Sequence, residues 1–384
     1  MVKRDFWINK IERLWKNRSV IWLSGVRRVG KTCLCRSLEN IEYFDCELPS
    51  TRRIMESPEM FLKSAIGKRI VIDEIHRLSN PSELLKISAD HFPALRIIAT
   101  GSSTLSASAK FKDTLTGRKE SLLLTPLLCS EPDFFKNFNL EDRMLKGGLP
   151  QYFLQDSAGS ASFQEWLDSY WAKDIQELFR LEKRHAFMKL LELVFLNSGG
   201  MFEATRYAKP CEISRPTVGT YLDVLETTSL VHIIRPFNTK RKSEIVSAPK
   251  VYAFDTGFVC FNKGIESIRR DDYGLLWEHL VLNEIIGRLQ TKKVYYWRDK
   301  QGHEIDFILR ASENAPLAVE CKWSAEDASP SNLIIFRKLY PEGKNFIVGR
   351  DIIRPYTRDS KGILITYTNL EGLIRELEVS GRFL

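Results

Sequence analysis

The chain has 384 residues, 43% of them hydrophobic, and its 57 Lys and Arg residues outnumber its 49 Asp and Glu residues, which gives a net charge of +8. This length is more than one core usually needs and predicts two or three domains, and the positive charge favours an acidic partner such as nucleic acid. No apolar run approaches the roughly 18 residues that cross a bilayer, and the seven cysteines form no C-x-x-C pair, so we expect a soluble cytoplasmic protein without a membrane segment, a zinc site or a disulfide framework.

The first predicted element is a short amphipathic helix, because Phe6, Ile8, Ile11 and Leu14 recur at close to helical spacing. Strand-like apolar runs then alternate with helical patterns. Such alternation predicts an α/β fold with a parallel sheet that is covered by helices on both faces. The predicted strands are residues 20–24, 41–46, 70–73, 95–100 and 121–125.

A complete phosphate-binding loop, GVRRVGKT, follows the first of these strands and runs from Gly25 to Thr32. Gly25 and Gly30 let the backbone curl tightly, so that successive N–H groups surround the β-phosphate, and the helix that begins at Lys31 adds its positive dipole end. Lys31 would span the β- and γ-phosphates of ATP, and Thr32 would ligate Mg²⁺. A chance strand-to-helix turn is disfavoured, because the strand and helix signals stand in the right places. The other residues of the predicted ATP site are Val26, Arg27, Arg28, Val29 and Cys33.

Two acidic residues complete the predicted ATPase site, because the apolar strand in RIVIDEIHR ends directly in Asp73 and Glu74. Asp73 would hold the Mg²⁺ shell, and Glu74 would polarise the attacking water. The next strand, RIIATGSST, ends in the hydroxyl side chains of Thr100, Ser102 and Ser103. They would hold the lytic water or sense the γ-phosphate, although helix capping is an equally good interpretation for Ser102.

An arginine follows the glycine of LTGR, just before the last predicted strand of the sheet. Arg118 could reach the γ-phosphate bound by a neighbouring subunit and neutralise charge that develops during hydrolysis. This interpretation predicts a homo-oligomer. The alternative is an ordinary surface arginine, since arginine is usually exposed.

Helical periodicity without strands continues from Asp133 to about Asn197 and is interrupted by a forced turn at GGLP, residues 147–150. This stretch is interpreted as a helical lid or connector. Ser214 and Pro216 then give the N-cap and first turn of a further helix, which two predicted strands follow. The helix and strands resemble a winged helix-turn-helix with a basic wing that would contact phosphates, and the alternative is a small α+β subdomain with a solvated basic loop. The basic residues near the tip are Lys240, Arg241, Lys242 and Lys250.

From about Gly264 the chain is α/β again and brings a second set of charged residues. Asp306 enters an apolar strand after a glycine turn, and Glu320 and Lys322 alternate on the next strand, so that both point to one face. Asp306 and Glu320 could share a divalent metal, Mg²⁺ or Mn²⁺, while Lys322 orients the nucleophilic water. Glu278, in the helix-like WEHLVLNEIIGRL, would supply a further carboxylate. Such a site would hydrolyse a phosphodiester; the alternative is chance, because acid and lysine alternate on many edge strands.

A set of motifs runs in order through nearly the whole chain: GVRRVGKT, VIDEIH, ATGSS, LTGR, GGLP, SRPTVGTYLDVLE, PKVYAFDTG, WEHLVLNEI, YYWRD, EIDF and VECK. Together they resemble the prokaryotic AAA-type ATPases that carry a C-terminal winged-helix and PD-(D/E)xK nuclease-like region. The resemblance implies a P-loop NTPase sheet of the additional-strand, catalytic-glutamate class, with Arg118 as arginine finger. It also implies a restriction-endonuclease-like α/β fold around the C-terminal charged residues. The chain departs from the pattern at Val26, where many relatives have proline, and at Ile305, which replaces the proline of the nuclease motif.

These patterns predict an AAA+ ATPase core at residues 1–130, a helical lid or connector at 131–185, a winged-helix domain at 186–260 and a nuclease-like domain at 261–384. The predicted function is ATP hydrolysis by a homo-oligomer that acts on nucleic acid, with DNA favoured, and that carries a metal-dependent nuclease-like domain. The alternative is an ATP-dependent regulatory switch whose C-terminal region binds nucleic acid or protein without cutting. A small-molecule kinase is disfavoured, because the adjacent acids and the long C-terminal region argue against it.

Overall fold

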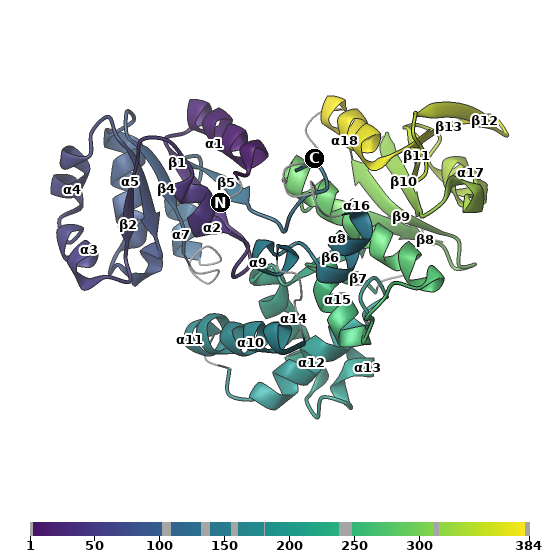
Figure 1. Cartoon of the computed structure of the whole chain (residues 1–384), viewed down its shortest axis with the longest axis horizontal. Helices are drawn as coiled ribbons and strands as arrows, with labels where there is room; N and C mark the ends of the chain where they lie inside the picture. The colour runs from purple at the N-terminus through teal and green to yellow at the C-terminus, as the bar shows by residue number, and fades with distance from the viewer. Residues whose placement is uncertain are drawn as a thin grey trace.

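A computed structural model of the chain describes residues 3–101, 109–131, 139–154, 160–179, 181–237, 248–310 and 315–380. Figure 1 shows an N-terminal α/β part and a C-terminal α/β part on two sides of the molecule, with the helices of the middle region between and below them. None of the helices in these ranges is long and apolar enough to cross a membrane.

The strands of the N-terminal part are β1 (Val20–Ser24), β2 (Ile41–Asp45), β3 (Arg69–Asp73), β4 (Arg96–Ala99) and β5 (Lys119–Leu123). They pair in parallel in the order β2-β3-β4-β1-β5, which confirms the predicted parallel sheet. Strand β4 lies between β1, which leads into the phosphate loop, and β3, which ends at Asp73, and it is the additional strand that was expected. The central strands are buried on both faces, which explains their continuous apolar sequences.

The helices around this sheet are α1 (Asp5–Asn17), α2 (Lys31–Arg36), α3 (Pro49–Ile54), α4 (Pro58–Ser64), α5 (Pro81–His91) and α7 (Ala109–Leu115). Alternate residues of a strand point to opposite faces. Ile21 and Ile98 accordingly pack in one buried cluster with residues of α1 and α2, whereas Trp22 and Ile97 pack in another with residues of α4, α5 and α7. Helices therefore cover both faces, as predicted.

The middle region is mainly helical. Its elements are α8 (Leu140–Lys146), α9 (Pro150–Phe153), α10 (Ser160–Tyr170), the π-helical segment η3 (Trp171–Gln176), α11 (Glu177–Phe179), α12 (Arg184–Leu196), α13 (Ala204–Ala208), α14 (Arg215–Thr227), β6 (Val231–Pro236), β7 (Lys250–Ala253) and α15 (Thr256–Lys263). Ser214 caps α14 as predicted, since its side chain accepts a hydrogen bond from the Thr217 N–H at 3.3 Å. Helix α14 and the antiparallel pair β6–β7 follow the predicted order, and the winged-helix assignment stays a prediction.

The predicted GGLP turn lies between α8 and α9, where two glycines pack against a buried ion pair. Gly148 donates its N–H to the carboxylate of Asp255 at 2.6 Å, and Asp255 lies 3.6 Å from the guanidinium of Arg143. A Cβ at Gly147, which has φ +78°, would stand 1.9 Å from Asp255, and a Cβ at Gly148 would stand 2.4 Å from Arg143. Only glycine allows this close approach, so the turn fixes α8 to α15.

The C-terminal part contains α16 (Tyr273–Leu289), β8 (Val294–Arg298), β9 (Glu304–Arg310), β10 (Pro316–Lys322), α17 (Ser331–Leu339), β11 (Asn345–Gly349), β12 (Tyr356–Ser360), β13 (Ile363–Thr368) and α18 (Leu370–Val379). Its sheet has the order β12-β13-β11-β10-β9-β8-β6-β7. Strand β6 pairs with β8 through Arg235 and Tyr295, so the strands predicted as a wing also extend the C-terminal sheet. One sheet thus crosses the boundary predicted between residues 260 and 261.

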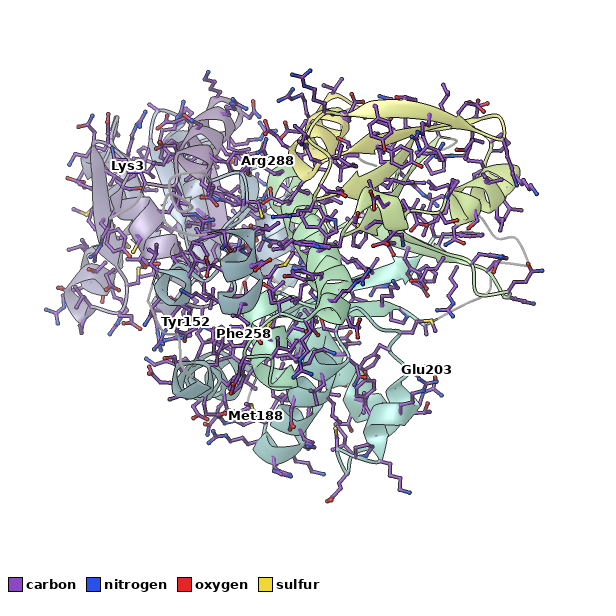
Figure 2. All side chains as sticks on the ribbon, turned by 45° about the vertical axis from the view of Figure 1, so that its right-hand side comes forward. Lys3, Tyr152, Met188, Glu203, Phe258 and Arg288 are labelled. Carbon is purple, nitrogen blue, oxygen red and sulfur yellow. The ribbon has the colours of Figure 1, made fainter. Side chains whose placement is uncertain are left out.

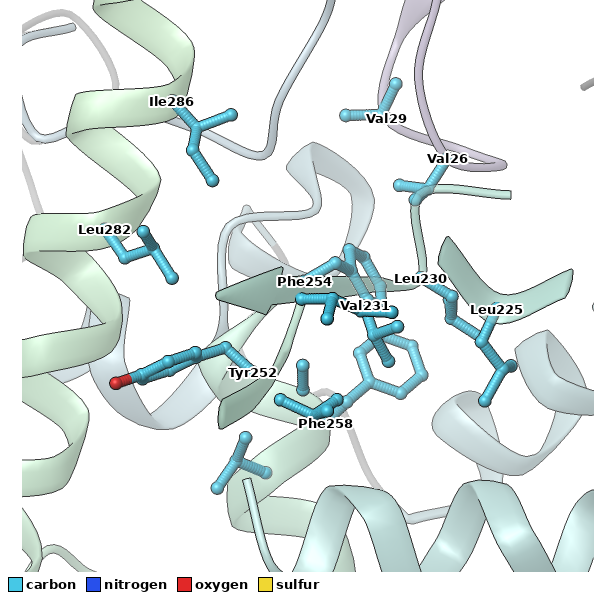
Figure 3. Close-up of a cluster of buried hydrophobic side chains, with 14 of the residues drawn as sticks. Val26, Val29, Leu225, Leu230, Val231, Tyr252, Phe254, Phe258, Leu282 and Ile286 are labelled. Atoms are coloured by element: carbon cyan, nitrogen blue, oxygen red, sulfur yellow. The ribbon is translucent and has the colours of Figure 1, made fainter. Parts of the chain in front are cut away.

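A continuous buried cluster connects the phosphate loop to the rest of the molecule. Figure 3 shows Val26 and Val29 of the loop near Leu230 and Phe254, with Ile286 of α16 on the other side of the same cluster. Val26 is therefore a core residue, which gives a packing reason for the apolar side chain that stands where many relatives have proline. Helix α16 also contacts the N-terminal part: the Lys10 ammonium of α1 donates a hydrogen bond to the backbone carbonyl of Arg288 at 2.7 Å. Figure 2 labels Arg288.

Candidate functional site

The phosphate loop borders a cavity of about 630 Å³. The predicted loop residues line it with the exception of Val29, which is buried in the core. Gly25 and Gly30 have φ of +144° and +101°, and a Cβ on Gly25 would lie 2.4 Å from the carbonyl oxygen of Leu124. The glycines are thus required where the loop was predicted to need them.

Lys31 turns its ammonium back onto the loop, where it donates to the carbonyl oxygens of Gly25 at 2.8 Å and Val26 at 3.2 Å. Burial lowers the pKa of Lys31, and the nearby carboxylates of Glu74, Asp174 and Asp73 oppose this effect. The ammonium therefore lies among acids at the end of the loop, in the position from which it can reach a bound phosphate.

Asp73 lies at the end of β3 beside the helix that follows the phosphate loop. Its carboxylate accepts hydrogen bonds from the hydroxyls of Tyr43 and Thr100, and the hydroxyl of Thr32 is 3.4 Å away. A threonine hydroxyl and a carboxylate side by side on a cavity wall are suitable oxygen ligands for Mg²⁺. The residues present fit this ion. The predicted contributions of Ser102 and Ser103 lie outside the described residues.

Glu74 adopts a left-handed backbone conformation, with φ +52°, directly before the 3₁₀ turn η1 (Ile75–Arg77). Its N–H donates to the Thr100 hydroxyl at 3.2 Å, and its carboxylate lies 3.1 Å from the ring nitrogen Nδ1 of His76. The contact with His76 lowers the pKa of Glu74. The carboxylate is therefore ionised at neutral pH, the form in which it can accept a proton from water.

Several cavity residues come from the middle region and were not predicted from sequence: Tyr170, Lys173, Asp174, Leu178 and Thr228. Helix α10 and its π-helical extension rest directly on the phosphate loop. Trp166 donates to the carbonyl of Arg27 at 3.2 Å, and Glu165 is 2.9 Å from the guanidinium of Arg28. For the first four, the sequence signal is the helical periodicity that predicted a lid or connector, whereas Thr228 ends the helix that was predicted after Ser214.

Asp174 is the acid that this lid segment brings to the loop. One of its carboxylate oxygens, Oδ2, is 3.6 Å from the Arg27 guanidinium and has no hydrogen-bond partner within the described part of the chain. Burial raises the pKa of Asp174, and Arg27 and Lys31 oppose the effect. A carboxylate thus lines the same cavity as Lys31, beside the loop.

Arg118 lies at the opposite end of the strands from the phosphate loop. Residue Lys119 pairs with Val20 at the beginning of β1, whereas the phosphate loop follows the end of that strand at Ser24. The Arg118 side chain is bound to Asp90 at 2.7 Å and to the carbonyl of Thr114 at 3.1 Å. It does not line the cavity of its own chain, so it cannot act on the nucleotide of that chain in this conformation.

The four predicted C-terminal residues come together. Val319 pairs with Phe307 in the antiparallel register of β10 and β9, so the next step places Glu320 opposite Asp306. Lys322 is 3.6 Å from Glu320, and Asp306 accepts a hydrogen bond from the Cys321 N–H at 2.7 Å. Burial raises the pKa values of Asp306 and Glu320, and the charge of Glu278 on α16 raises both further.

The structure corrects the prediction for Lys250, which is not at the tip of a solvated wing. It is 5% exposed, and its ammonium is 2.5 Å from Glu304 and 3.4 Å from Glu278. No local pattern indicates this burial, because Lys250 follows a long basic stretch and β7 was expected to form a wing. Its contact with nucleic-acid phosphates is thus excluded while it stays buried; Lys240, Arg241 and Lys242 lie outside the described residues.

Lysine ammoniums therefore lie between the carboxylates of this cluster. In the ranges that the structure describes, no group of three or more His, Cys, Asp or Glu side chains is arranged to hold a metal ion. As they stand, the residues do not fit the divalent metal that was expected at Asp306 and Glu320.

Comparison with protein families finds the AAA domain over residues 17–132. Residues 137–269 and 273–369 match two families described as domains of unknown function, DUF8612 and DUF4143. The AAA match, together with the parallel sheet and the phosphate loop, identifies the N-terminal part as an AAA-type P-loop ATPase domain.

Two relatives that match most of this chain are identical to it at about a quarter of the aligned residues. The chain is 26% identical over 325 residues to an uncharacterized protein of Mycobacterium tuberculosis, a match that spans 82% of this chain and 72% of the relative. It is 25% identical over 333 residues to an uncharacterized protein of Methanocaldococcus jannaschii, spanning 77% and 73% of the two chains. Among solved structures, the Walker-type ATPase of Pyrococcus abyssi is 17% identical with a TM-score of 0.44, over 68% of this chain and 96% of that one.

Proposed function

We propose that the AAA-type P-loop domain binds ATP with Mg²⁺ in the cavity beside the loop and hydrolyses it. One observation carries the proposal: a single cavity brings together the phosphate loop, the Thr32–Asp73 oxygen pair and the ionised carboxylate of Glu74. Loop, metal ligands and base are the parts that phosphoryl transfer to water requires.

The side chains have distinct roles in this proposal. Lys31 leaves the carbonyls of Gly25 and Val26 and binds the β- and γ-phosphates. Mg²⁺, held by Thr32 and Asp73, supplies charge neutralisation for the phosphates. Glu74 accepts a proton from the attacking water as the water oxygen bonds to the γ-phosphorus, and the bond to the β–γ bridging oxygen breaks to release ADP.

We also propose that the active form is a homo-oligomer. The position of Arg118 supports this proposal. Arg118 lies at the end of the strands that is remote from its own phosphate loop, and its side chain is half-exposed. In an oligomer this guanidinium would leave Asp90 and stabilise charge on the γ-phosphate bound by a neighbour.

The division into four domains is likewise a proposal, in which the nucleotide cavity is closed by residues of the lid segment.

The experiment is a steady-state ATP hydrolysis assay on the full chain. Lys31→Ala removes the phosphate-binding cation, so turnover should fall by about 10²-fold or more. The matched control is Lys68→Ala, since Lys68 is an exposed lysine whose partner is Glu42 at 2.9 Å. Hydrolysis by Lys31→Ala at the wild-type rate would overturn the proposal.

A second candidate function is action of the C-terminal part on nucleic acid, with DNA as the first choice. The observation that favours it is the pairing of the half-buried Asp306 with the buried Glu320 and with Lys322 beside it, the residue types expected of a phosphodiester-cleaving site. Lysine ammoniums occupy the cluster, so metal-dependent cleavage would first require that they move. The alternative is a regulatory switch that binds nucleic acid or protein without cutting it.

A cleavage assay separates these alternatives. Plasmid, linear and single-stranded DNA are incubated with Mg²⁺ or Mn²⁺, with and without ATP. Cleavage that is lost in Asp306→Asn but kept in the exposed control Asp359→Asn supports the nuclease, and ATP hydrolysis should be unchanged in both variants. No cleavage under any of these conditions would favour the switch.

A further inference from the structure

We infer that Lys250 is the resident cation of the carboxylate cluster, and that a divalent metal enters the cluster only when the Lys250 ammonium leaves it. The inference rests on the second candidate function in one respect, since it concerns the regulation of the same site. It is tested below by metal binding, which is measured independently of cleavage.

The contacts of Lys250 are those of a bound cation. Its ammonium lies 2.5 Å from Glu304 and 3.4 Å from Glu278, and the Tyr252 hydroxyl, which donates to Glu278, is also 3.4 Å away. The aromatic ring of Tyr296 lies 5.7 Å from the same ammonium. Carboxylates and an aromatic ring thus enclose a side chain that is 5% exposed.

At the other end of the cluster a second lysine, Lys322, contacts only one of the two carboxylate oxygens of Glu320. Lys322 lies 3.6 Å from Glu320 Oε2, whereas Glu320 Oε1 is buried and has no hydrogen-bond partner within the residues described. Glu320 is 3% exposed, so this oxygen cannot take a partner from bulk solvent. A buried acceptor without a partner is costly, which makes Glu320 Oε1 a ligand position that the present arrangement leaves unused.

Electrostatics then explain the exclusion of a metal. Burial lowers the pKa of Lys250, but the carboxylates of Glu278 and Asp306 raise it, so the Lys250 charge acts on both acids. A metal at Asp306 and Glu320 would therefore meet the like charges of Lys250 and Lys322 at short range in a buried site, where such repulsion is weakly screened. The ammonium contacts Glu278 and Glu304, and its charge opposes a metal at the neighbouring Asp306 and Glu320.

The Lys250 side chain can leave the cluster without a movement of its strand. Strand β7 is held on both sides: it pairs with β6 on one side, and on the other the Gly199 N–H donates to the Val251 carbonyl at 2.8 Å and the Val251 N–H donates to the Gly200 carbonyl at 3.1 Å. A rotation of the long Lys250 side chain would withdraw the ammonium from Glu278 and Glu304 and leave these carboxylates free.

The test is Mn²⁺ binding to the full chain, measured by isothermal titration calorimetry. Lys250→Met keeps the length of the side chain and removes its charge, so Mn²⁺ should bind at least about tenfold more tightly than to the wild type. Lys250→Arg keeps the charge and should show no gain. Lys344→Met is the matched control, because Lys344 is an exposed lysine of the same region that pairs with Glu376 at 2.9 Å.

Equal Mn²⁺ affinity of Lys250→Met and the wild type, or no binding by either, would overturn the inference. Adding Asp306→Asn to Lys250→Met should abolish the gain, and a gain that survives this change would place the metal elsewhere and also count against it. If Lys250→Met does not fold, as judged by circular dichroism, Lys250→Met/Glu304→Gln restores the charge balance and is judged by the same criterion.

Metal binding and cleavage can fail separately. Tight Mn²⁺ binding by Lys250→Met without DNA cleavage supports the inference and contradicts the nuclease proposal. Cleavage by the wild type with Mn²⁺ affinity unchanged in Lys250→Met supports the nuclease and contradicts the role of Lys250.

Discussion

At the scale of single residues, the candidate nucleotide site contains side chains that sequence motifs indicate and side chains that only the three-dimensional structure identifies. Lys31, Asp73 and Glu74, which the loop and the acidic strand end indicate, line one cavity, because each lies at the end of a strand of the same parallel sheet. Asp174 and Tyr43 reach the same site from separate elements, and no local pattern encodes those contacts. Ser102 remains a prediction.

Asp174 should weaken ATP binding, because its carboxylate faces the phosphate end of the cavity. Asp174→Asn removes that charge, and nucleotide affinity should rise by about fivefold, the effect of the ~1 kcal/mol that unit charges exert on each other at 4 Å in water. Titration of the full chain with a fluorescent nucleotide measures it. Asp168→Asn is the control, since Asp168 is an exposed acid of the preceding helix α10, paired with Arg184. An unchanged or lower affinity of Asp174→Asn would show that the carboxylate does not oppose the phosphates.

At the scale of elements, helix α16 joins the two candidate sites. Glu278 on this helix belongs to the carboxylate cluster, whereas Glu284 accepts a hydrogen bond from the Cys129 N–H beyond β5. Gln290, directly after the helix, accepts from the Leu123 N–H at 2.7 Å and donates to the Leu123 carbonyl at 3.0 Å, as a neighbouring strand would. One element therefore contacts both the ATPase sheet and the C-terminal cluster.

Glu284 makes the stability of this junction depend on pH. Burial raises its pKa from 4.5 to about 7, so between these values the folded protein keeps a proton that the unfolded chain has released. The stability that neutral Glu284 contributes is present below pH 4.5 and is lost as pH rises through 7, by about 3 kcal/mol in total. Glu284→Gln is neutral throughout, so it should gain stability relative to the wild type as pH rises.

Urea unfolding of both proteins at pH 5, 6, 7 and 8 measures the difference, because other titrating groups are common to both. Glu226→Gln, at a half-exposed acid of α14, is the control. A difference between Glu284→Gln and the wild type that does not change with pH would contradict a buried acid at this position.

The predicted elements agree with the structure most closely where the burial of a single strand or helix determines its sequence pattern. The five predicted strands of the N-terminal sheet overlap β1 to β5, because buried parallel strands have continuous apolar sequences. The pairing of Arg235 with Tyr295 joins strands that are distant in the chain, and no periodicity reports it. For the same reason the basic stretch before Lys250 indicated a solvated wing, although that lysine is buried.

At the scale of the whole molecule, one buried cluster runs from Val26 and Val29 through Phe254 to Ile286 (Figure 3). Packed side chains thus connect the loop to α16, and Arg118 does not line the cavity of its own chain. The two candidate sites are therefore connected within one chain, and the proposed homo-oligomer would in addition bring Arg118 to the ATPase site of a neighbour.

The proposed arginine finger predicts complementation between inactive subunits. Arg118→Ala retains the phosphate loop and Lys31→Ala retains the arginine, so a mixture should regain part of the ATP turnover that each variant lacks alone. The hydrolysis assay is run across mixing ratios, with wild type plus Lys31→Ala as reference. A mixture that stays as inactive as its components at every ratio would argue against an arginine acting between subunits.

Hydrolysis of ATP in this cavity, with Glu74 as the base, is the central claim. The most direct measurement is a single-turnover assay with protein in excess over labelled ATP, comparing the wild type with Glu74→Gln. Glu74→Gln should bind ATP with an affinity close to that of the wild type and release phosphate at least about 10²-fold more slowly. Phosphate release by Glu74→Gln at the wild-type rate would contradict the claim.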